Sequence, residues 1–441
     1  MEPIAQIVEQ VYRQESGQIL ATLIASLRDF TLAEDALQDA VEVALRQWPA
    51  SGVPRNPAAW LTAIARRRAI DRLRREGILA RKQETLQALT LDMASDGADG
   101  ADDADGADDA DGDPDDAAPI PDERLKLLFT CCHPALPLEA RVALTLRTLG
   151  GLSTAEIASA FLTPLPTMAQ RLVRAQRKIR DAGIPYRVPP LPLLAERIEG
   201  VLAVLYLIFN EGYASTSGDA LIRQDLCAEA IRLTRVLVEL IAREPELPDA
   251  PEATGLLALM LLHSSRRAAR VDAAGNLVVL EDQDRTRWNW GEIIEGMELL
   301  DAALAQRQPG PYQIQAAISA LHAEAPTPGE TDWRQIALLY ARLADMTPSP
   351  VVELNQAVAV AMADSPEAGL ALLDQLRLEE TLAHYHLYHA ARADLLRRAA
   401  RHEEAATAYR AALRLCQNRI EQRFLQRRLA EVTARHASET V

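Results

Sequence analysis

Basic residues recur at helical spacing in two stretches of the chain, and grouped cations of this kind can bind phosphate. In the first stretch, the polar Thr167 and the basic Arg171, Arg174 and Lys178 follow one another at intervals of four, three and four residues, which places them on one face of a helix. In the second, 58–76, the basic face carries Arg66, Arg67, Arg68, Arg72, Arg74 and Arg75. Such faces bind nucleic acid, contact anionic membranes or remain solvated, so the pattern alone leaves these three interpretations open.

The residues before the first basic stretch predict a helix, a turn and a second helix. Gly150 and Gly151 end a helix expected over 140–149. Ser153 and Glu156 have the spacing of a capping box, which starts a short helix reaching about Phe161. Thr163 to Pro166 form a turn, and a longer helix begins near Pro166 or Thr167.

This layout is that of a helix-turn-helix, whose second helix enters the major groove of DNA. The stripe of the second helix expected to be buried comprises Met168, Leu172, Ala175 and Ile179. The N-terminal polar residues would reach base edges, namely Thr167, Gln170 and Arg171, and the later ones would hold phosphates, namely Arg174, Arg177 and Lys178. The alternative is an ordinary helical hairpin with a basic exposed face.

Two further helices are expected in the N-terminal segment 1–82. One carries an apolar stripe of Ala33, Leu37, Ala40, Val41, Ala44, Leu45 and Trp48, with an opposite acidic face of Glu34, Asp35, Gln38, Asp39 and Glu42. Prolines between 49 and 57 then break the pattern. The basic helix follows, from about Ala58 to Glu76, with an apolar stripe of Trp60, Leu61, Ile64, Ala65, Ile70 and Leu73.

Composition bounds the fold class and the compartment. The chain has 441 residues, which allows about two to four domains. Apolar residues make up 49% and aromatic residues 4%, which favours an all-α protein with real cores. Four cysteines exclude a disulfide scaffold and indicate a reducing compartment, the cytoplasm. The apolar runs are too short to span a bilayer and no secretory signal is present, so we expect no membrane partner.

The distribution of charge matters more than its sum. A net charge of −16 argues against binding DNA when taken as an average. However, residues 83–123 hold 15 acidic residues and no basic one, whereas residues 124–190 are net +7 and residues 191–441 are net −10. The low-complexity run of Ala, Asp and Gly in 83–123 predicts an extended, solvated linker. We therefore expect an acidic linker between two locally basic helical domains.

Four short motifs in order resemble a bacterial sigma factor of the extracytoplasmic-function type, in the sigma-70 family. The second conserved region of that family is similar to Ala33-Glu34-Asp35 with Gln38, and to Trp60-Leu61 followed by Ala69-Ile70-Asp71-Arg72. The fourth region is similar to Leu152-Ser153 with Glu156-Ile157-Ala158, and to Thr167 with Arg171-Leu172 and Arg174-Ala175. The resemblance implies binding to RNA polymerase core and to promoter DNA.

The resemblance also assigns roles to individual residues. It implies that the acidic face binds core polymerase through Glu34, Asp35, Gln38 and Asp39. It implies that the basic helix opens and reads the −10 element through Trp60, Arg66, Arg67, Arg68, Asp71, Arg72, Arg74 and Arg75. The helix-turn-helix would read the −35 element. In this family the linker passes through the RNA channel of the polymerase, so an acidic linker is expected to occupy a path built for RNA.

The C-terminal residues 191–441 are expected to form an α-solenoid-like domain. Two related helix pairs, 351–376 and 384–413, align at an offset of 37 residues, near the tetratricopeptide period. Ala393, Tyr409 and Ala412 fit small and aromatic packing positions of such a repeat. The layout resembles the sigma subgroup with a tetratricopeptide-like extension, which implies a protein or small-molecule regulator of this domain.

Three other segments carry chemistry-capable side chains. Phe209–Tyr213 and Arg285–Trp290 mix polar and aromatic residues, and either is a ligand or docking site or, as is more common, a structural cluster. Cys131-Cys132-His133 has metal-capable side chains, but adjacent cysteines rarely ligate one Zn²⁺, so packing is the favoured interpretation. No catalytic spacing is present, and we expect no enzyme, metal or cofactor.

The sequence thus predicts an all-α sigma factor with four parts. These are 1–82, sigma region 2; 83–123, the acidic linker; 124–190, sigma region 4 with its helix-turn-helix; and 191–441, the tetratricopeptide-like domain. The alternative is a one-component helix-turn-helix regulator with a ligand- or protein-sensing helical domain. That alternative explains residues 124–441 but does not explain the paired acidic and basic helices of 33–75.

Overall fold

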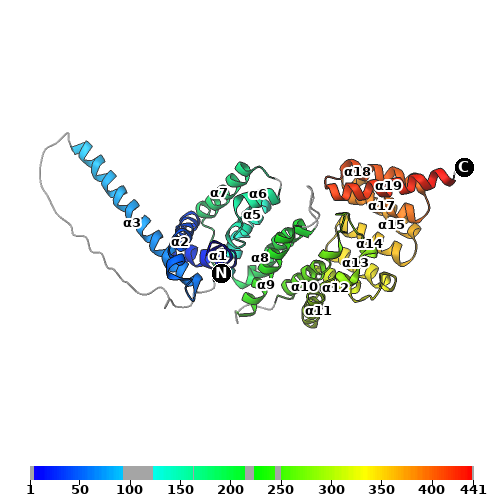
Figure 1. The fold of residues 1–441 in the computed structure, drawn as a ribbon, viewed down its shortest axis with the longest axis horizontal. Helices are drawn as coiled ribbons and strands as arrows, with labels where there is room; N and C mark the ends of the chain where they lie inside the picture. Colours follow the sequence, from blue (N-terminus) through cyan, green and yellow to red (C-terminus); the bar gives the residue numbers. More distant parts are fainter. Residues whose placement is uncertain (1–3, 93–122, 162, 214–222, 244–249, 440–441) are drawn as a thin grey trace. The chain divides into compact units, whose positions relative to one another are not determined.

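The protein forms two compact units of helices. The computed structural model describes residues 4–92, 123–161, 163–213, 223–243 and 250–439. Unit 1 comprises Met1–Val201 and unit 2 comprises Leu202–Val441, so the division falls within helix α8 (Leu191–Tyr213). The described residues contain no β-strand, only an isolated bridge between Val271 and Leu277. The predicted all-α class is confirmed (Figure 1).

The first three helices of unit 1 pack against one another. They are α1 (Ile4–Leu27), α2 (Phe30–Ser51) and α3 (Pro57–Asp92). The Asp29 carboxylate caps α2 by accepting from the Leu32 N–H at 3.0 Å, and Asn56 Oδ1 accepts from the Ala59 N–H at 3.0 Å at the start of α3. These caps satisfy backbone donors that the helix itself cannot.

Helix α3 is longer than the sequence pattern predicts. It was expected to end near Glu76 but continues to Asp92, into the segment assigned to the linker. Residues 78–91 are rich in Leu, Ala and Gln, which are good helix formers. Figure 1 shows α3 continuing past its neighbours α1 and α2. Most of the predicted linker, 93–122, lies outside the described residues.

Not every apolar residue of the predicted stripes is buried. Ala65 and Ala69 are buried against the bundle, whereas Ile70 and Leu73 are 39% and 47% exposed. On α2, Leu45 is 42% exposed although the helical period placed it on the buried stripe. Ala44 and Ala69, which directly precede Leu45 and Ile70, are buried, so the exposed residues lie at the edge of their apolar stripes.

Four further helices complete the rest of unit 1. They are α4 (Arg124–Cys131), α5 (Leu138–Thr148), α6 (Thr154–Ala160) and α7 (Leu165–Asp181). Helix α7 packs on α5 and α6, and α1 contacts α4 and α5. The Tyr186 hydroxyl, which follows α7, donates to the backbone carbonyl of Ala21 in α1 at 2.7 Å. The two groups of helices in unit 1 are therefore in direct contact.

Unit 2 is a succession of helices in which neighbours along the chain pack together. After the end of α8 come α9 (Gln224–Arg243), α10 (Pro251–Ser264), α11 (Trp290–Ala305), α12 (Pro311–Glu324), α13 (Trp333–Met346), α14 (Pro350–Ala363), α15 (Pro366–Gln375), α16 (Leu378–Leu382), α17 (His386–Arg398), α18 (His402–Leu415) and α19 (Arg419–Glu439). Several begin at proline, whose fixed φ and missing N–H suit the first helical position.

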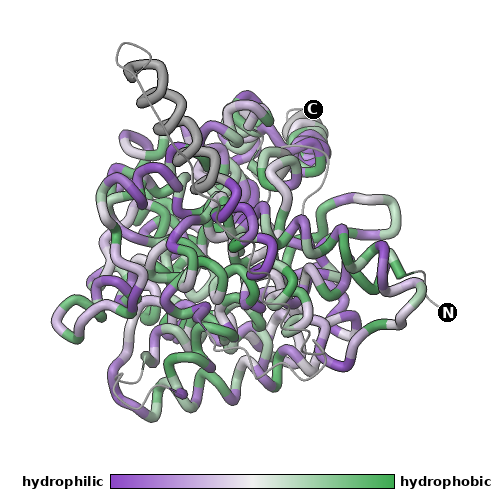
Figure 2. Tube along the Cα trace, turned by 90° about the vertical axis from the view of Figure 1, so that its left-hand side faces the viewer, coloured by the Kyte–Doolittle hydropathy of each residue, from purple (hydrophilic) through white to green (hydrophobic). Residues whose placement is uncertain are grey.

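The two predicted helix pairs of the C-terminal part are present. Helix α14 packs on α15, and α17 packs on α18. Ala393, Tyr409 and Ala412 are buried in one core cluster, as the repeat pattern predicts. Figure 2 shows hydrophobic and hydrophilic residues alternating along individual helices, as expected where each helix buries one face. None of the described helices has the length and apolar character that crossing a membrane requires.

Candidate nucleic-acid and polymerase interface

The helix-turn-helix is built by local signals that the sequence predicts. The Ser153 N–H donates to the Glu156 carboxylate at 2.7 Å, and the Glu156 N–H donates to Ser153 Oγ at 3.1 Å. This capping box starts α6. The predicted buried stripe of α7 is confirmed and comprises Met168, Leu172, Ala175 and Ile179. The stripe fixes the rotation of α7 and so determines which residues face solvent.

The outer face of α7 is exposed and basic. Five of its six predicted DNA-binding side chains are exposed, namely Thr167, Gln170, Arg174, Arg177 and Lys178, and Arg171 is half-buried. The described structure therefore presents them on the side of α7 opposite its core stripe. A helix held by its apolar stripe with cations opposite can lie in a groove lined by phosphates.

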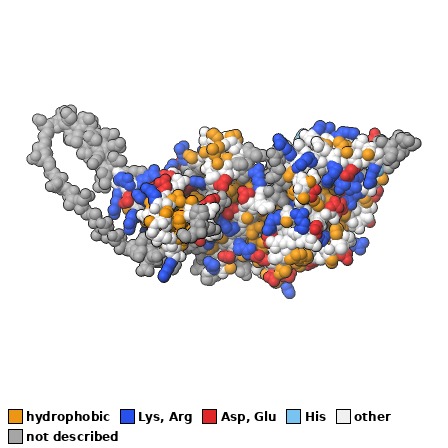
Figure 3. All heavy atoms as spheres, in the orientation of Figure 1, with side chains coloured by type: hydrophobic (Ala, Val, Ile, Leu, Met, Phe, Trp, Pro, Cys, Tyr) orange, Lys and Arg blue, Asp and Glu red, His pale blue; other side chains and the backbone are white. Residues whose placement is uncertain are grey.

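The second basic surface lies on α3. Arg66, Arg67, Arg68, Arg72, Arg74 and Arg75 are exposed, and Asp71 is half-buried. Figure 3 shows Lys and Arg side chains gathered over the described part of α3. Asp71 accepts through its backbone carbonyl from Arg75 Nε at 3.3 Å. The arginines are close enough together to bind several phosphates of one nucleic-acid strand.

Trp60 differs from the other residues predicted to read the −10 element. It is only 8% exposed, and its ring packs edge-to-face on Trp48 with centroids 5.5 Å apart. Its position on the apolar stripe of α3 explains this burial, because that stripe faces α1 and α2. In this structure the Trp60 ring is therefore covered by its neighbours, and its assigned role at the −10 element stays a prediction.

The acidic face of α2 is only partly exposed. Gln38 and Asp39 face solvent, whereas Glu34 and Asp35 are half-buried. Asp35 forms an ion pair with Arg72 of α3 at 2.7 Å. A residue assigned to polymerase binding thus pairs with a residue assigned to DNA binding. This ion pair connects the acidic face of α2 with the basic face of α3.

Glu34 is contacted by the second helical group of the same unit. Its carboxylate accepts from Arg147 of α5 at 3.3 Å and from the Gln176 amide of α7 at 3.1 Å. Burial raises the pKa of Glu34, and the nearby positive charge of Arg147 opposes this only in part. The predicted polymerase contact therefore lies in an interface inside unit 1.

Sequence reasoning did not identify Arg147 and Gln176 as partners of Glu34. They lie 113 and 142 residues from Glu34 along the chain. Arg147 is the last-turn cation of α5, and Gln176 borders the basic face of α7. No local spacing connects residues so far apart, and only the packing of the two helical groups brings them together.

The adjacent cysteines of α4 are core residues. Cys131 Sγ lies 3.2 Å from Thr148 Oγ1, and Cys132 Sγ lies 3.5 Å from Thr145 Oγ1. Burial raises the pKa of both thiols, that of Cys132 to about 11. Their predicted packing role is confirmed, because both side chains are buried between α4 and α5.

Another group of side chains, in unit 2, could hold a metal ion. His386, Cys416 and Glu421 each offer one ligand atom, and these atoms lie within 4.8 Å of one another. His386 Nε2 lies 3.0 Å from the Glu421 carboxylate, so the group already satisfies itself by hydrogen bonding. The three residues come from α17, the end of α18 and the start of α19, and no sequence motif indicated them.

The segment Phe209–Tyr213 has a structural role within unit 2. The rings of Phe209 and Tyr213 stack with centroids 5.7 Å apart, and His263 packs edge-on against both rings. The Arg270 guanidinium lies over the Tyr213 ring at 3.9 Å. These contacts support the structural interpretation of this segment.

Comparison with known proteins agrees with the geometry of unit 1. Residues 11–78 match the family model for sigma-70 region 2, and residues 126–179 match the model for sigma-70 region 4. The chain belongs to the sigma-70 family. Residues 197–304 of this sigma factor match a family of unknown function, DUF6596. The match to region 2 covers the helices that a one-component helix-turn-helix regulator does not explain.

Two relatives support the same conclusion. The sigma factor is 43% identical over 422 residues to the uncharacterized protein R00370 of Rhizobium meliloti (strain 1021), covering 96% of this chain and 95% of that protein. It is 29% identical over 174 residues to the ECF RNA polymerase sigma factor SigK of Mycobacterium ulcerans (strain Agy99), covering 38% of this chain and 82% of that protein. No solved structure matches the chain.

The comparisons establish the class and the general partners. Sigma factors are non-enzymatic transcription initiation factors, and their regions 2 and 4 imply RNA polymerase core and promoter DNA as partners. The chain is an ECF-like sigma factor with a C-terminal extension. The extension comprises the helices that follow region 4, most of them in unit 2.

Proposed function

We propose that this sigma factor directs core polymerase to a subset of promoters through three surfaces of unit 1. Helix α7 reads the −35 element with Thr167, Gln170 and Arg171, while Arg174, Arg177 and Lys178 hold phosphates. Helix α3 captures the opened −10 strand with Trp60, Arg66, Arg67, Arg68, Asp71, Arg72, Arg74 and Arg75. Glu34, Asp35, Gln38 and Asp39 of α2 bind core polymerase.

The observation that carries this proposal is the basic face of α7 opposite its buried stripe. The six residues assigned to DNA lie outside the core stripe, whereas Met168 and its partners fill the interior. The assignment of bases to the first turn follows from helix-turn-helix geometry, in which the N-terminal end of the second helix approaches the groove most closely.

Run-off transcription with purified core polymerase tests the proposal. The full-length protein should bind core and start transcripts at defined promoters, and failure in both would refute it. Replacing Arg171 and Arg174 by Ala should weaken promoter binding by the holoenzyme about 100-fold, at about 1 to 3 kcal/mol per lost contact. Arg180→Ala is the matched control, because Arg180 lies on α7 and contacts Asp181 at 3.4 Å.

We further propose that the C-terminal extension, residues 191–441, is a tetratricopeptide-like regulatory domain. The paired helices α14–α15 and α17–α18 support this, because such pairs build surfaces for ligands or proteins. Truncation after about residue 190 should alter run-off activity, and an unchanged activity would refute a regulatory role.

The acidic segment 83–123 is proposed to occupy the RNA path of the polymerase. Its 15 acidic residues and lack of basic residues make it a polyanion, as a nucleic acid is. Replacing its aspartates by asparagine should weaken core binding or alter initial transcription. No change in either measurement would contradict this part of the proposal.

A further inference from the structure

Unit 2 contains a cavity that the proposed function does not use. It has a volume of about 580 Å³ and lies among the 3₁₀ segments near 280–287, the end of α12 and helices α14, α17, α18 and α19. This volume falls within the range of about 300 to 1,000 Å³ that is usual for small-molecule sites. The cavity includes part of the Arg285–Trp290 segment, which the sequence marked as a candidate ligand or docking site.

The walls of the cavity are largely apolar and aromatic. Trp333, Tyr409 and Phe424 provide aromatic surface, and Val358, Met362 and Leu425 provide aliphatic surface. They come from α13, α14, α18 and α19, which are far apart in the sequence. Apolar walls of this size favour a ligand that carries a substantial hydrophobic body.

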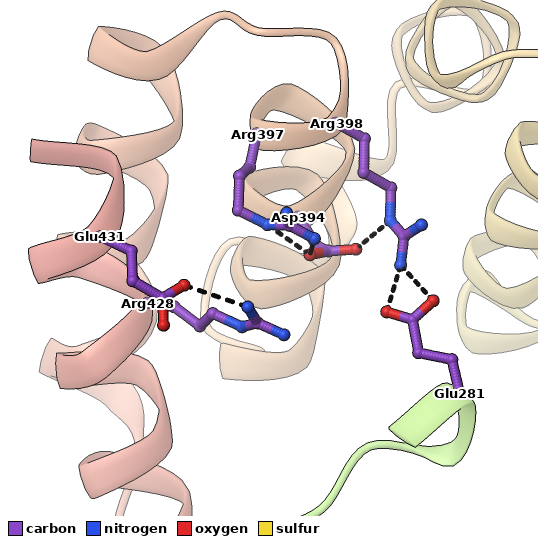
Figure 4. Close-up of polar contacts among 6 residues, drawn as sticks. All are labelled: Glu281, Asp394, Arg397, Arg398, Arg428 and Glu431. Carbon is purple, nitrogen blue, oxygen red and sulfur yellow. Dashed lines mark hydrogen bonds and ion pairs between the residues drawn. The ribbon is translucent and has the colours of Figure 1, made fainter. Parts of the chain in front are cut away.

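Three arginines also line the cavity, and their charges are balanced to different degrees. Arg398 donates to both oxygens of Glu281 at 2.6 and 2.8 Å and, through Nε, to Asp394 at 2.7 Å (Figure 4). Arg428 pairs with Glu431 at 3.0 Å. Arg398 is therefore fully compensated within the protein, and Arg428 has one carboxylate partner.

Arg285 is the arginine without a carboxylate partner. It donates to the backbone carbonyls of His322 at 2.7 Å and Ala325 at 2.5 Å, and its guanidinium lies 4.6 Å from the centroid of the Trp288 ring. No carboxylate among the described residues lies within ion-pair distance of it. The Nε atoms of Arg285 and Arg428 are buried and have no hydrogen-bond partner. Buried donors of this kind are costly unless something accepts from them.

The balance of charge in the cavity gives the charge of its ligand. The ionisable lining residues are Glu281, Arg285, Asp394, Arg398 and Arg428. When the outer partners Arg397 (of Asp394) and Glu431 (of Arg428) are included, the sum is one positive charge, which is that of Arg285. His322 also lines the cavity, and burial, with the charges of Arg266 and Arg285, lowers its pKa to about 3, so it is neutral at pH 7. One negative charge on a ligand would neutralise the site.

We propose that this cavity binds a small organic anion, a carboxylate with an apolar or aromatic body, whose carboxylate pairs with Arg285. The body of the ligand packs against Trp333, Phe424 and Val358, and Arg428 adds positive potential beside it. A charge-assisted hydrogen bond of this kind is roughly twice as strong as one between neutral groups. The extension of this sigma factor is then a sensor of a small metabolite.

Calorimetric titration of the full-length protein with matched probes tests the proposal. The probes are 1-naphthylacetate and its neutral analogue 1-naphthylacetamide, and octanoate with octanamide. We expect at least one of the two carboxylates to bind saturably at one site per chain, and its amide to bind at least about tenfold more weakly, because tenfold corresponds to about 1.4 kcal/mol. Absence of saturable binding by both carboxylates, or equal binding of each amide, would overturn the proposal.

Variants locate the binding. Arg285→Gln should weaken the carboxylate about tenfold or more, and its matched control Arg334→Gln changes an exposed arginine of α13 outside the cavity. Because Arg285→Gln also removes two bonds to backbone carbonyls, Val358→Phe provides a second variant, which fills the cavity and leaves those bonds intact. Binding that survives both changes in folded protein, as judged by circular dichroism, would place the ligand elsewhere and refute the site.

Discussion

Two half-buried carboxylates, one in each unit, both contact arginine, but their pKa values are shifted in opposite directions. In unit 1, Glu34 contacts Arg147 at 3.3 Å and the neutral Gln176 at 3.1 Å, and burial raises its pKa. In unit 2, burial alone would raise the pKa of Asp394, but hydrogen bonds and charge from Arg398 and Arg397, at 2.7 and 2.6 Å, lower it. One cation at 3.3 Å does not compensate the cost of removing the carboxylate from water, whereas two cations at 2.6 and 2.7 Å do.

This difference in pKa shift indicates that the Asp394 cluster stabilises the fold, whereas the contact of Glu34 with Arg147 can be exchanged for another partner. Arg397 and Arg398 lie on the same helix as Asp394, and Arg398 also reaches Glu281, so this cluster fixes α17 to a distant segment (Figure 4). Glu34 gains little from its single arginine, which suits a residue proposed to bind a different protein.

The largest expected effect is on the cluster in unit 2. Asp394→Asn should lower the free energy of unfolding by about 2 kcal/mol or more, because two arginines lose the charge that compensates them. Urea denaturation and hydrogen exchange of peptides from α17 measure the loss. Asp345→Asn, at an exposed site of α13, is the control and should stay within about 0.5 kcal/mol of the parent. Equal stability of the two variants would show that the Asp394 cluster does not stabilise the fold.

His322, also in unit 2, is expected to make the free energy of unfolding depend on pH in the acid range. The pKa of His322 is lowered to about 3, so this histidine is neutral in the folded state but takes up a proton on unfolding below about pH 6.5. Its contribution is present above pH 6.5 and is lost as the pH falls toward 3, by about 1 to 2 kcal/mol between pH 7 and pH 5.

His322→Asn should flatten this part of the stability curve, measured by urea denaturation at pH 7, 6 and 5. His384→Asn, at an exposed position before α17, should reproduce the parent curve. If His322→Asn keeps the full pH dependence, His322 is not its source.

The smallest effect, of opposite sign, is expected at Glu34. Because its pKa is raised in the folded state, ionised Glu34 costs stability above its unfolded value of about 4.3, and the cost disappears as the pH falls toward that value. Glu34→Gln should therefore raise the free energy of unfolding at pH 7 by up to about 1 kcal/mol. Glu42→Gln, on the exposed side of α2, should change little. A clear loss of stability in Glu34→Gln would show that both carboxylates are structural.

Local features of the sequence predicted much of the fold and of the DNA-binding face. The capping box of Ser153 and Glu156 and the buried stripe of α7 depend on residues within one or two helical turns. Their geometry follows from helical periodicity, so it can be deduced without knowing the rest of the structure.

Features that depend on distant packing could not be deduced. Glu34 and Arg147 lie 113 residues apart, and Arg398 and Glu281 lie 117 residues apart. Ile70 is exposed although Ala69 beside it is buried, and Trp60 is buried in edge-to-face contact with Trp48 of another helix. No spacing within a single helix contains that information.

The burial of every cysteine has a practical consequence for reactivity. Cys131, Cys132, Cys227 and Cys416 are all buried, and burial raises the pKa of each thiol, that of Cys227 to about 12 and that of Cys416 to about 11. At neutral pH almost no thiolate is present to react with alkylating reagents. A single cysteine introduced at an exposed position could thus be labelled with a spectroscopic probe without removing the four native cysteines.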